Sequence, residues 1–304
     1  LSWELKSRER GQGQTAYQVL AGSAPNGSDL WDSGRVASAD SVGVIWAGRR
    51  LSSSQRVYWK VRVWDVRGQA SEWSRPTFFE TGLLSERDWS GARWIRDSRP
   101  APRDVYADDP IPLFGKTFTL PRAVKSARLY VTGLGYFEAS VNGKNVSEAV
   151  LEPGWTNYTK RVFYRTFDVT KLLKRGENEL TALVANGWWN PLPLMMFGGA
   201  ALLPKALATG RPRLIAKLEI TLTDGSRQTI TTDESWTVRN SALQFQNNYL
   251  GELWDFGAPA DTTRRVALAT EPVGALISEP QPSIKPIERL IPKKLTQLKP
   301  GVWL

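Results

Sequence analysis

The stretch VYWKVRVW at residues 57–64 decides the fold of the first part of the chain, because apolar side chains alternate along it with polar or amphipathic ones. Successive side chains of a β-strand point to opposite faces. The even-numbered residues from Tyr58 to Trp64 therefore share one face, and the odd-numbered residues from Val57 to Val63 share the other. The pattern predicts a half-buried β-strand.

Turn signals break the sequence on both sides of this strand, at residues 25–27, 33–34 and 67–68. Several short strands at this spacing are typical of an immunoglobulin or fibronectin-III sandwich. We expect a fibronectin-III-like β-sandwich over residues 1–82.

The same alternation resumes after a Pro- and Asp-rich connector at residues 83–112. The dipeptide Asn142-Gly143 separates two alternating runs, which is a strong signal for a type I′ hairpin. Gly133 and Gly135 are expected to permit a tight junction between strands. Alternating runs lie at 114–120, 127–132, 136–141, 217–222 and 228–232. We expect a jelly-roll β-sandwich over residues 113–265.

Proline becomes frequent from residue 266 onward. We expect residues 266–304 to form a Pro-rich linker and the truncated start of a further β domain. The fold class predicted for the whole chain is all-β.

Two residue types are missing from the 304 residues: there is no Cys and no His. Disulfides, thiolate nucleophiles, Ser-His-Asp chemistry and His-ligated zinc are thereby excluded. Any acid–base work would depend on carboxylates, Tyr or Lys.

The net charge of +10 comes from Lys and Arg residues that are dispersed along the chain. Dispersed charge is typical of a solvated surface, so we expect no nucleic-acid partner. No apolar run is long enough for a membrane-spanning helix, and we expect no membrane partner. The start, Leu1-Ser2-Trp3, lacks both Met and a secretion signal, so we expect that it has been trimmed. This N-terminal sequence therefore does not identify the cellular compartment, although a periplasmic or secreted location is favoured over a cytoplasmic one.

Two segments combine aromatic and amide side chains, at residues 151–158 and 186–191. Asn side chains match sugar hydroxyls, and an aromatic face stacks on the C–H face of a pyranose. The alternative is that the Trp residues plug the rim of a sandwich while the Asn residues fix turns. Residue types alone leave both interpretations open.

WDSG (31–34), YWKVRVWD (58–65) and FETGLL (79–84) resemble the front domain of bacterial α-L-rhamnosidases of glycoside hydrolase family 78. PGWTNYTKR (153–161), YRTFDVT (164–170), NGWWNP (186–191) and LGE (250–252) resemble its second, jelly-roll domain. The resemblance covers roughly residues 2–255.

The resemblance implies an accessory function. In the family, terminal α-L-rhamnose is hydrolysed by carboxylates of a later (α/α)6 barrel, and nothing in this chain resembles that barrel. We therefore expect an inactive N-terminal portion whose partners are rhamnose-containing glycans or glycosides and a catalytic (α/α)6 domain in the same or another chain. The residues that the resemblance assigns to L-rhamnose are Trp155, Asn157, Tyr158, Asn186, Trp188, Trp189 and Asn190.

The jelly-roll domain of some family members also holds Ca²⁺, for which the candidates in this chain are Asn157, Asn186 and Pro191. The family's anionic ligand is replaced here by Asn157, and Ca²⁺ needs some carboxylate charge. We expect no cofactor. The chain also departs from the family's pattern at residues 198–201 and 254–257.

Three other interpretations stay open: a scaffold that docks on a catalytic domain or partner without binding sugar, a binder of polyanions, and an autonomous hydrolase. The last would need a carboxylate pair. Asp108 and Asp109 are expected to be solvated, and Glu252 and Asp255 are expected to pair with Arg264 or Arg265.

Overall fold

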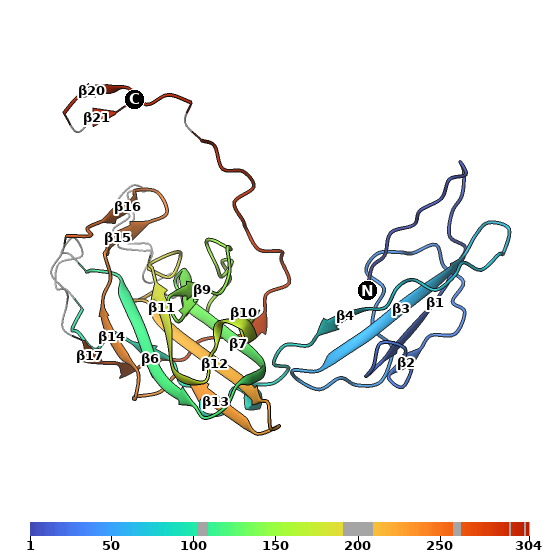
Figure 1. Cartoon of the computed structure of the whole chain (residues 1–304), viewed down its shortest axis with the longest axis horizontal. Coiled ribbons are helices and arrows are strands. Elements are labelled where there is room, and N and C mark those ends of the chain that lie inside the picture. Colours follow the sequence, from blue (N-terminus) through green and yellow to red (C-terminus); the bar gives the residue numbers. More distant parts are fainter. Residues whose placement is uncertain (102–108, 191–208, 258–262, 292, 301, 304) are drawn as a thin grey trace. The chain divides into compact units, whose positions relative to one another are not determined.

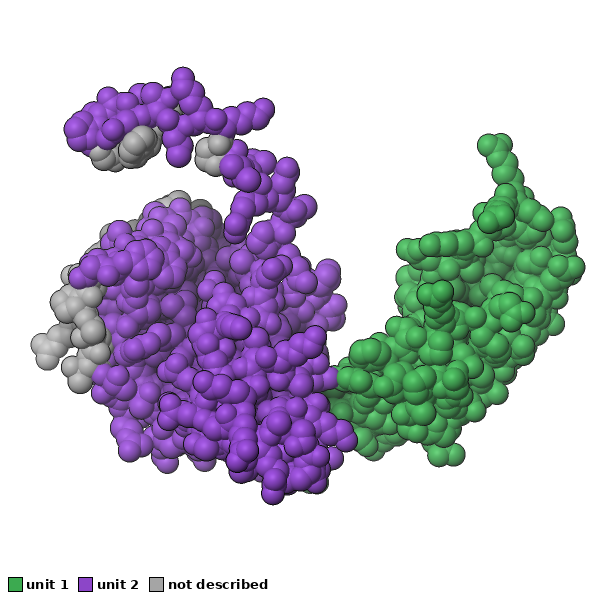
Figure 2. All heavy atoms as spheres, in the orientation of Figure 1, with its two compact units in different colours: residues 1–88 green, residues 89–304 purple. Residues whose placement is uncertain are grey.

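The computed structural model describes residues 1–101, 109–190, 209–257, 263–291, 293–300 and 302–303. The chain forms two compact units, residues 1–88 and residues 89–304 (Figures 1 and 2). Nearly all regular structure is β, as predicted. The helices among the residues that the structure describes are two short 3-10 helices, η1 (Glu86–Trp89) and η2 (Thr170–Leu172). In the described ranges no helix is long and apolar enough to cross a membrane.

Unit 1 is built on one antiparallel sheet with the strand order β2-β1-β3-β4. The predicted strand is confirmed as β3: Val57 and Val61 are buried, while the alternate side chains face the other way. The four strands are β1 (Ala16–Gly22), β2 (Trp31–Asp32), β3 (Arg56–Trp64) and β4 (Thr77–Glu80).

Irregular segments cover the core face of this sheet. Trp3 packs edge-on against Tyr17, with ring centroids 5.1 Å apart. Its indole N–H donates to Gln14 Oε1, and Gln14 Nε2 donates in turn to the carbonyls of Ser38 and Asp40. These bonds satisfy the buried Gln14 amide, so the second layer of unit 1 is held without long strands.

Unit 2 is a sandwich of a seven-stranded and a six-stranded sheet. The order of the first is β18-β5-β12-β7-β10-β19, with β13 also paired to β12. Its strands are β5 (Ile95–Arg96), β7 (Val124–Leu134), β10 (Arg161–Asp168), β12 (Arg213–Leu222), β13 (Arg227–Thr231), β18 (Ala267–Leu268) and β19 (Ala275–Ser278).

The second sheet has the order β17-β14-β6-β11-β8-β9. Two further hairpins, β15–β16 and β20–β21, complete the set of strands in the part of the chain that is described. These strands are β6 (Pro112–Leu120), β8 (Phe137–Val141), β9 (Lys144–Asn145), β11 (Gly176–Val184), β14 (Thr237–Asn240), β15 (Leu243–Asn247), β16 (Gly251–Trp254), β17 (Arg264–Arg265), β20 (Gln297–Lys299) and β21 (Val302–Trp303).

The core of unit 2 lies between the two sheets. Alternate residues of β7 and β12, such as Leu129 and Leu218, meet alternate residues of β6 and β11, such as Phe114 and Leu180. All four are at most 2% exposed. Burying a side chain of this size contributes about 1.5–3 kcal/mol.

The predicted hairpin at Asn142-Gly143 is confirmed. Both residues have positive φ, 52° and 74°, as a type I′ turn requires. Strands β8 and β9 lie on its two sides.

The first sheet of unit 2 uses residues on both sides of the 113–265 range. β5 comes from the segment expected as a connector, and it pairs with β12 and β18. β19 comes from the Pro-rich segment and runs parallel to β10, from Arg161↔Ala275 to Tyr164↔Ser278. Short strands from outside the predicted domain range thus complete this sheet.

Candidate carbohydrate-binding site

The loop at residues 151–158 is anchored from beneath by a buried ionic group. Glu152 is 4% exposed, and its Oε1 lies 2.8 Å from Arg165 Nε. Glu279, on the segment that follows β19, lies 3.1 Å from the same nitrogen, and its other oxygen accepts from Gly154 N. With Glu152 and Gly154 both held, the next residue, Trp155, is left 57% exposed.

The loop at residues 186–190 is held by amide side chains. Asn186 Nδ2 donates to the Gln246 carbonyl at 2.9 Å, and Gly187 N donates to Gln246 Oε1 at 2.9 Å. Asn190 Nδ2 donates to Asn186 Oδ1 at 2.8 Å. Gly187 has φ +51°, and a Cβ there would lie 2.9 Å from Tyr136 N. The Asn and Gly residues of this loop fix its path.

Three aromatic side chains from three loops meet above these anchors, and we call Trp155, Trp188 and Tyr249 the aromatic platform. Trp155 stacks on Trp188 with ring centroids 5.2 Å apart and planes 24° apart. Tyr249, from the turn of the β15–β16 hairpin, meets Trp188 edge-on at 5.9 Å. Burial raises the pKa of the neighbouring Tyr136, against the effect of its hydrogen bonds with Asn248 and Trp188.

Two of the residues predicted to bind sugar lie in the core instead of on the surface. Tyr158 and Trp189 are 6% and 3% exposed, and their rings pack edge-on at 5.4 Å. The Trp189 indole donates to the Arg211 carbonyl, and the Arg213 guanidinium covers its ring at 5.3 Å. Burial raises the pKa of Tyr158. Both rings have the surroundings of structural residues.

The structure therefore separates the residues predicted to bind sugar into exposed ones and buried ones. It brings Trp155 and Trp188 together and adds Tyr249, which the sequence reasoning missed. The one available signal was the Asn247-Asn248 turn just before the LGE motif. Asn157 is exposed, but its Oδ1 already accepts from the backbone N–H and the hydroxyl of Thr159.

The residues present do not fit Ca²⁺. Asn157 supplies an amide where a carboxylate would be needed, and Asn186 Oδ1 faces Asn190. Pro191 lies outside the described residues. Within the ranges that the structure describes, no group of three Asp or Glu side chains could hold a metal ion.

The carboxylates near the site have other surroundings than we expected. Desolvation, followed by repulsion from Glu252, raises the pKa of Glu138. Arg264 donates to Asp97 and Asn240, whereas Glu252 accepts from the Trp254 indole and Asp255 from Gly257 N. The expected pairing of the two carboxylates with Arg264 is therefore wrong, and no ion pair with Arg265 is seen among the described residues.

Asp109 is also not a solvated residue. Its two oxygens accept from Arg211 Nε and Nη2 at 2.8 and 2.6 Å. Asp108 and residues 198–201 lie outside the described residues.

Two family models match the chain. Residues 122–286 match the α-L-rhamnosidase N-terminal domain, and residues 1–85 match the Rha78A-like, N-terminal immunoglobulin domain. An α-L-rhamnosidase of Formosa agariphila is 30% identical over 100% of the chain and 35% of its own length. One from Alteromonas sp. (strain LOR) is 36% identical over 84% of the chain and 28% of its own length. The chain thus spans about a third of the length of these relatives.

Solved structures of α-L-rhamnosidases are also similar to this chain. The α-L-rhamnosidase from Dictyoglumus thermophilum is 31% identical with a TM-score of 0.82, covering 99% of this chain and 35% of that one. The Aspergillus terreus enzyme is 30% identical with a TM-score of 0.75, covering 89% and 32%.

Proposed function

Because the chain belongs to the α-L-rhamnosidase family, matching its N-terminal domains, we propose that it is the accessory, sugar-recognising portion of an enzyme that removes terminal α-L-rhamnose from glycans or glycosides. Hydrolysis then takes place in a catalytic (α/α)6 domain, in the same or another chain. The role of the two units is to hold and present the sugar.

The aromatic platform is the observation that carries this proposal. Trp155 keeps more than half of its surface in water although it stacks on Trp188. An indole held flat by a second ring has already lost its rotational freedom, so a ligand meets a rigid apolar surface at little entropic cost. The C–H face of L-rhamnose, with its C6 methyl group, offers a matching apolar surface.

Calorimetric titration of the chain with L-rhamnose tests the platform. Trp155→Ala should weaken binding roughly twofold to tenfold, the range expected for one aromatic contact. Trp254→Ala is the matched control, because Trp254 is also an exposed indole but stacks on Phe256 and not on a ring of the platform. No heat at millimolar sugar, or equal losses in both variants, would refute sugar recognition by the platform.

A second candidate function is a scaffold that docks on the catalytic domain without binding sugar. The β15–β16 hairpin favours it, because Leu250, Leu253 and Phe256 are 57%, 60% and 83% exposed. Contiguous exposed apolar side chains often mark interaction surfaces. If this function is correct, polar substitutions at Leu253 and Phe256 weaken association with the catalytic domain, whereas Trp155→Ala does not.

A further inference from the structure

Cations and indoles alternate on the outer face of the unit 1 sheet, and we call Arg35, Trp64, Arg62, Trp73 and Lys60 the basic ladder. The Arg62 guanidinium lies over both Trp64 and Trp73, at 5.0 and 4.8 Å from the ring centroids. The Arg35 guanidinium lies 5.1 Å from the first ring, and Lys60 Nζ lies 5.4 Å from the second. All four distances are in the range of a cation–π interaction.

The alternation along β3 builds this ladder. Lys60, Arg62 and Trp64 share one face of the strand because side chains alternate with a period of two. Gln18 lies opposite Arg62 on β1, and its Oε1 accepts from Arg62 Nε and Nη2 at 3.0 and 2.7 Å. The orientation of the Arg62 guanidinium is therefore fixed, and its Nη1 remains available as a hydrogen-bond donor.

The second indole of the ladder is placed by backbone bonds. The N–H groups of Ser71 and Ser74 donate to the carbonyls of Val63 and Val61, and their hydroxyls accept from the N–H groups of the same two residues. Trp73, between the two serines, is thereby held alongside β3.

The positive charge of the ladder is not balanced by carboxylates. In the part of the chain that the structure describes, Arg35, Lys60 and Arg62 form no ion pair. The acidic side chains of neighbouring strands have other partners: Glu80 pairs with Arg56, and Asp32 accepts from Gln18 and Gly34. The three cations of the ladder thus lie side by side on one face of the sheet without a carboxylate partner among the described residues.

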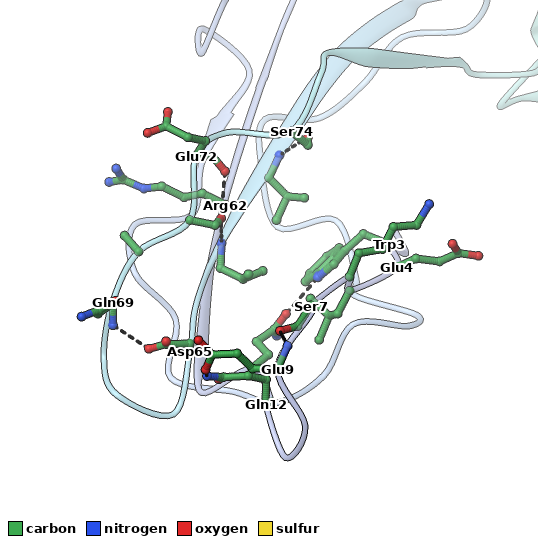
Figure 3. Close-up of a pocket in the computed structure, with 18 of the residues that line it drawn as sticks. Trp3, Glu4, Ser7, Glu9, Gln12, Arg62, Asp65, Gln69, Glu72 and Ser74 are labelled. Atoms are coloured by element: carbon green, nitrogen blue, oxygen red, sulfur yellow. Dashed lines mark hydrogen bonds between the residues drawn. The ribbon is translucent and has the colours of Figure 1, made fainter.

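The hollow beside the ladder does not share this unbalanced positive charge. It measures about 750 Å³ and has Arg62 and Glu72 on one side and Trp3 and Glu4 on the other (Figure 3). Glu9 and Asp65 also line it. Four carboxylates and three cations line the hollow, so it does not favour an anion in the way that the ladder does.

We propose that the basic ladder binds an acidic polysaccharide, a chain that carries carboxylate or sulfate groups. The cations cover faces of Trp64 and Trp73, so these rings have little room for the base stacking on which single-stranded nucleic acids depend. The accessible groups are N–H donors in a row, which match anions repeated along an extended chain. The choice of a polysaccharide rests on the proposed function in the α-L-rhamnosidase family.

Affinity electrophoresis in gels containing polygalacturonate or dextran sulfate tests the proposal, and the two probes distinguish carboxylate from sulfate recognition. The double variant Arg35→Gln/Lys60→Gln keeps the central Trp64–Arg62–Trp73 contacts, so its unit 1 should stay folded. We expect this variant to bind at least one probe roughly tenfold more weakly than the parent chain. Lys171→Gln/Arg175→Gln, which removes the same charge from exposed positions of unit 2, is the matched control and should bind almost as well as the parent.

Equal losses in the two double variants would show that net charge alone attracts the polymer, and would overturn the proposal. So would a single-stranded polynucleotide that competes as strongly as the acidic polysaccharide through the same two cations. Calorimetry with neutral L-rhamnose separates this proposal from the first one: the ladder variant should keep that signal, and Trp155→Ala should keep its affinity for the polyanion.

Discussion

Arg165 is the residue that holds two buried carboxylates together beneath the aromatic platform. Its side chain is 13% exposed, and those of Glu152 and Glu279 are 5% and 4% exposed. One guanidinium cannot neutralise two carboxylates, so the group carries an excess negative charge in a poorly solvated place. Burial raises the pKa of Glu279, and repulsion from Glu152 adds to the increase, while Arg165 and Gly154 N oppose it.

This residue-level arrangement predicts a pH dependence of stability. Because its pKa is raised on folding, Glu279 binds its proton more tightly in the folded chain than in the unfolded chain. Its contribution to stability is therefore fully present below the ordinary Glu pKa of 4.5 and is lost as the pH rises through the folded pKa.

Urea unfolding between pH 4.5 and 7.5 measures the effect. Relative to Glu279→Gln, which mimics the protonated form, the parent chain should lose stability as the pH rises. Glu148→Gln, which changes an exposed glutamate of the same unit, should give the same pH dependence as the parent. Parallel curves for the parent and Glu279→Gln would contradict the prediction.

At the scale of elements, the junction between β7 and β8 brings the first sheet of unit 2 into contact with the loop of residues 185–187. Gly135 has φ +110°, and a Cβ at this position would lie 1.9 Å from the Ala185 carbonyl oxygen. The expected tight junction is thus confirmed, and the close approach also positions Tyr136 beside Gly187.

Two glycine substitutions separate steric contact from backbone preference. Gly143→Ala also falls at positive φ, +74°, but meets nothing within 4 Å, so it should cost about 1–2 kcal/mol. Gly135→Ala adds a collision with backbone and should cost roughly 3 kcal/mol or more. Chemical denaturation of both variants provides the comparison, and equal losses would show that the junction relaxes freely.

The elements also show which features of the fold can be predicted from local sequence patterns. Alternation found β3 and β12, and the Asn142-Gly143 pair found its turn, because these signals are local. The roles of Asn186 and Trp189 depend on Gln246 and Arg211, whose partners sequence spacing does not reveal. β19 was missed because proline density concealed a four-residue strand.

At the scale of the whole molecule, the proposed accessory function predicts that this chain binds sugar and does not hydrolyse it. Among the described residues, the buried carboxylates of Glu152 and Asp97 are paired with arginines. We expect no release of nitrophenol from an aryl α-L-rhamnoside by the chain alone. A catalytically active family relative is the positive control, and clear turnover by this chain would contradict the accessory function.

The parallel pairing of β19 with β10 has a consequence for protein engineering. A fragment that stops at residue 265, where the alternating pattern fades, would expose the backbone of β10 from Arg161 to Tyr164. A bare strand edge invites pairing with other chains, so such a fragment is at risk of aggregating during expression. Keeping residues up to about 284, where Val150 N donates to the Ile284 carbonyl, would seal that edge and give a better-behaved reagent for every binding experiment.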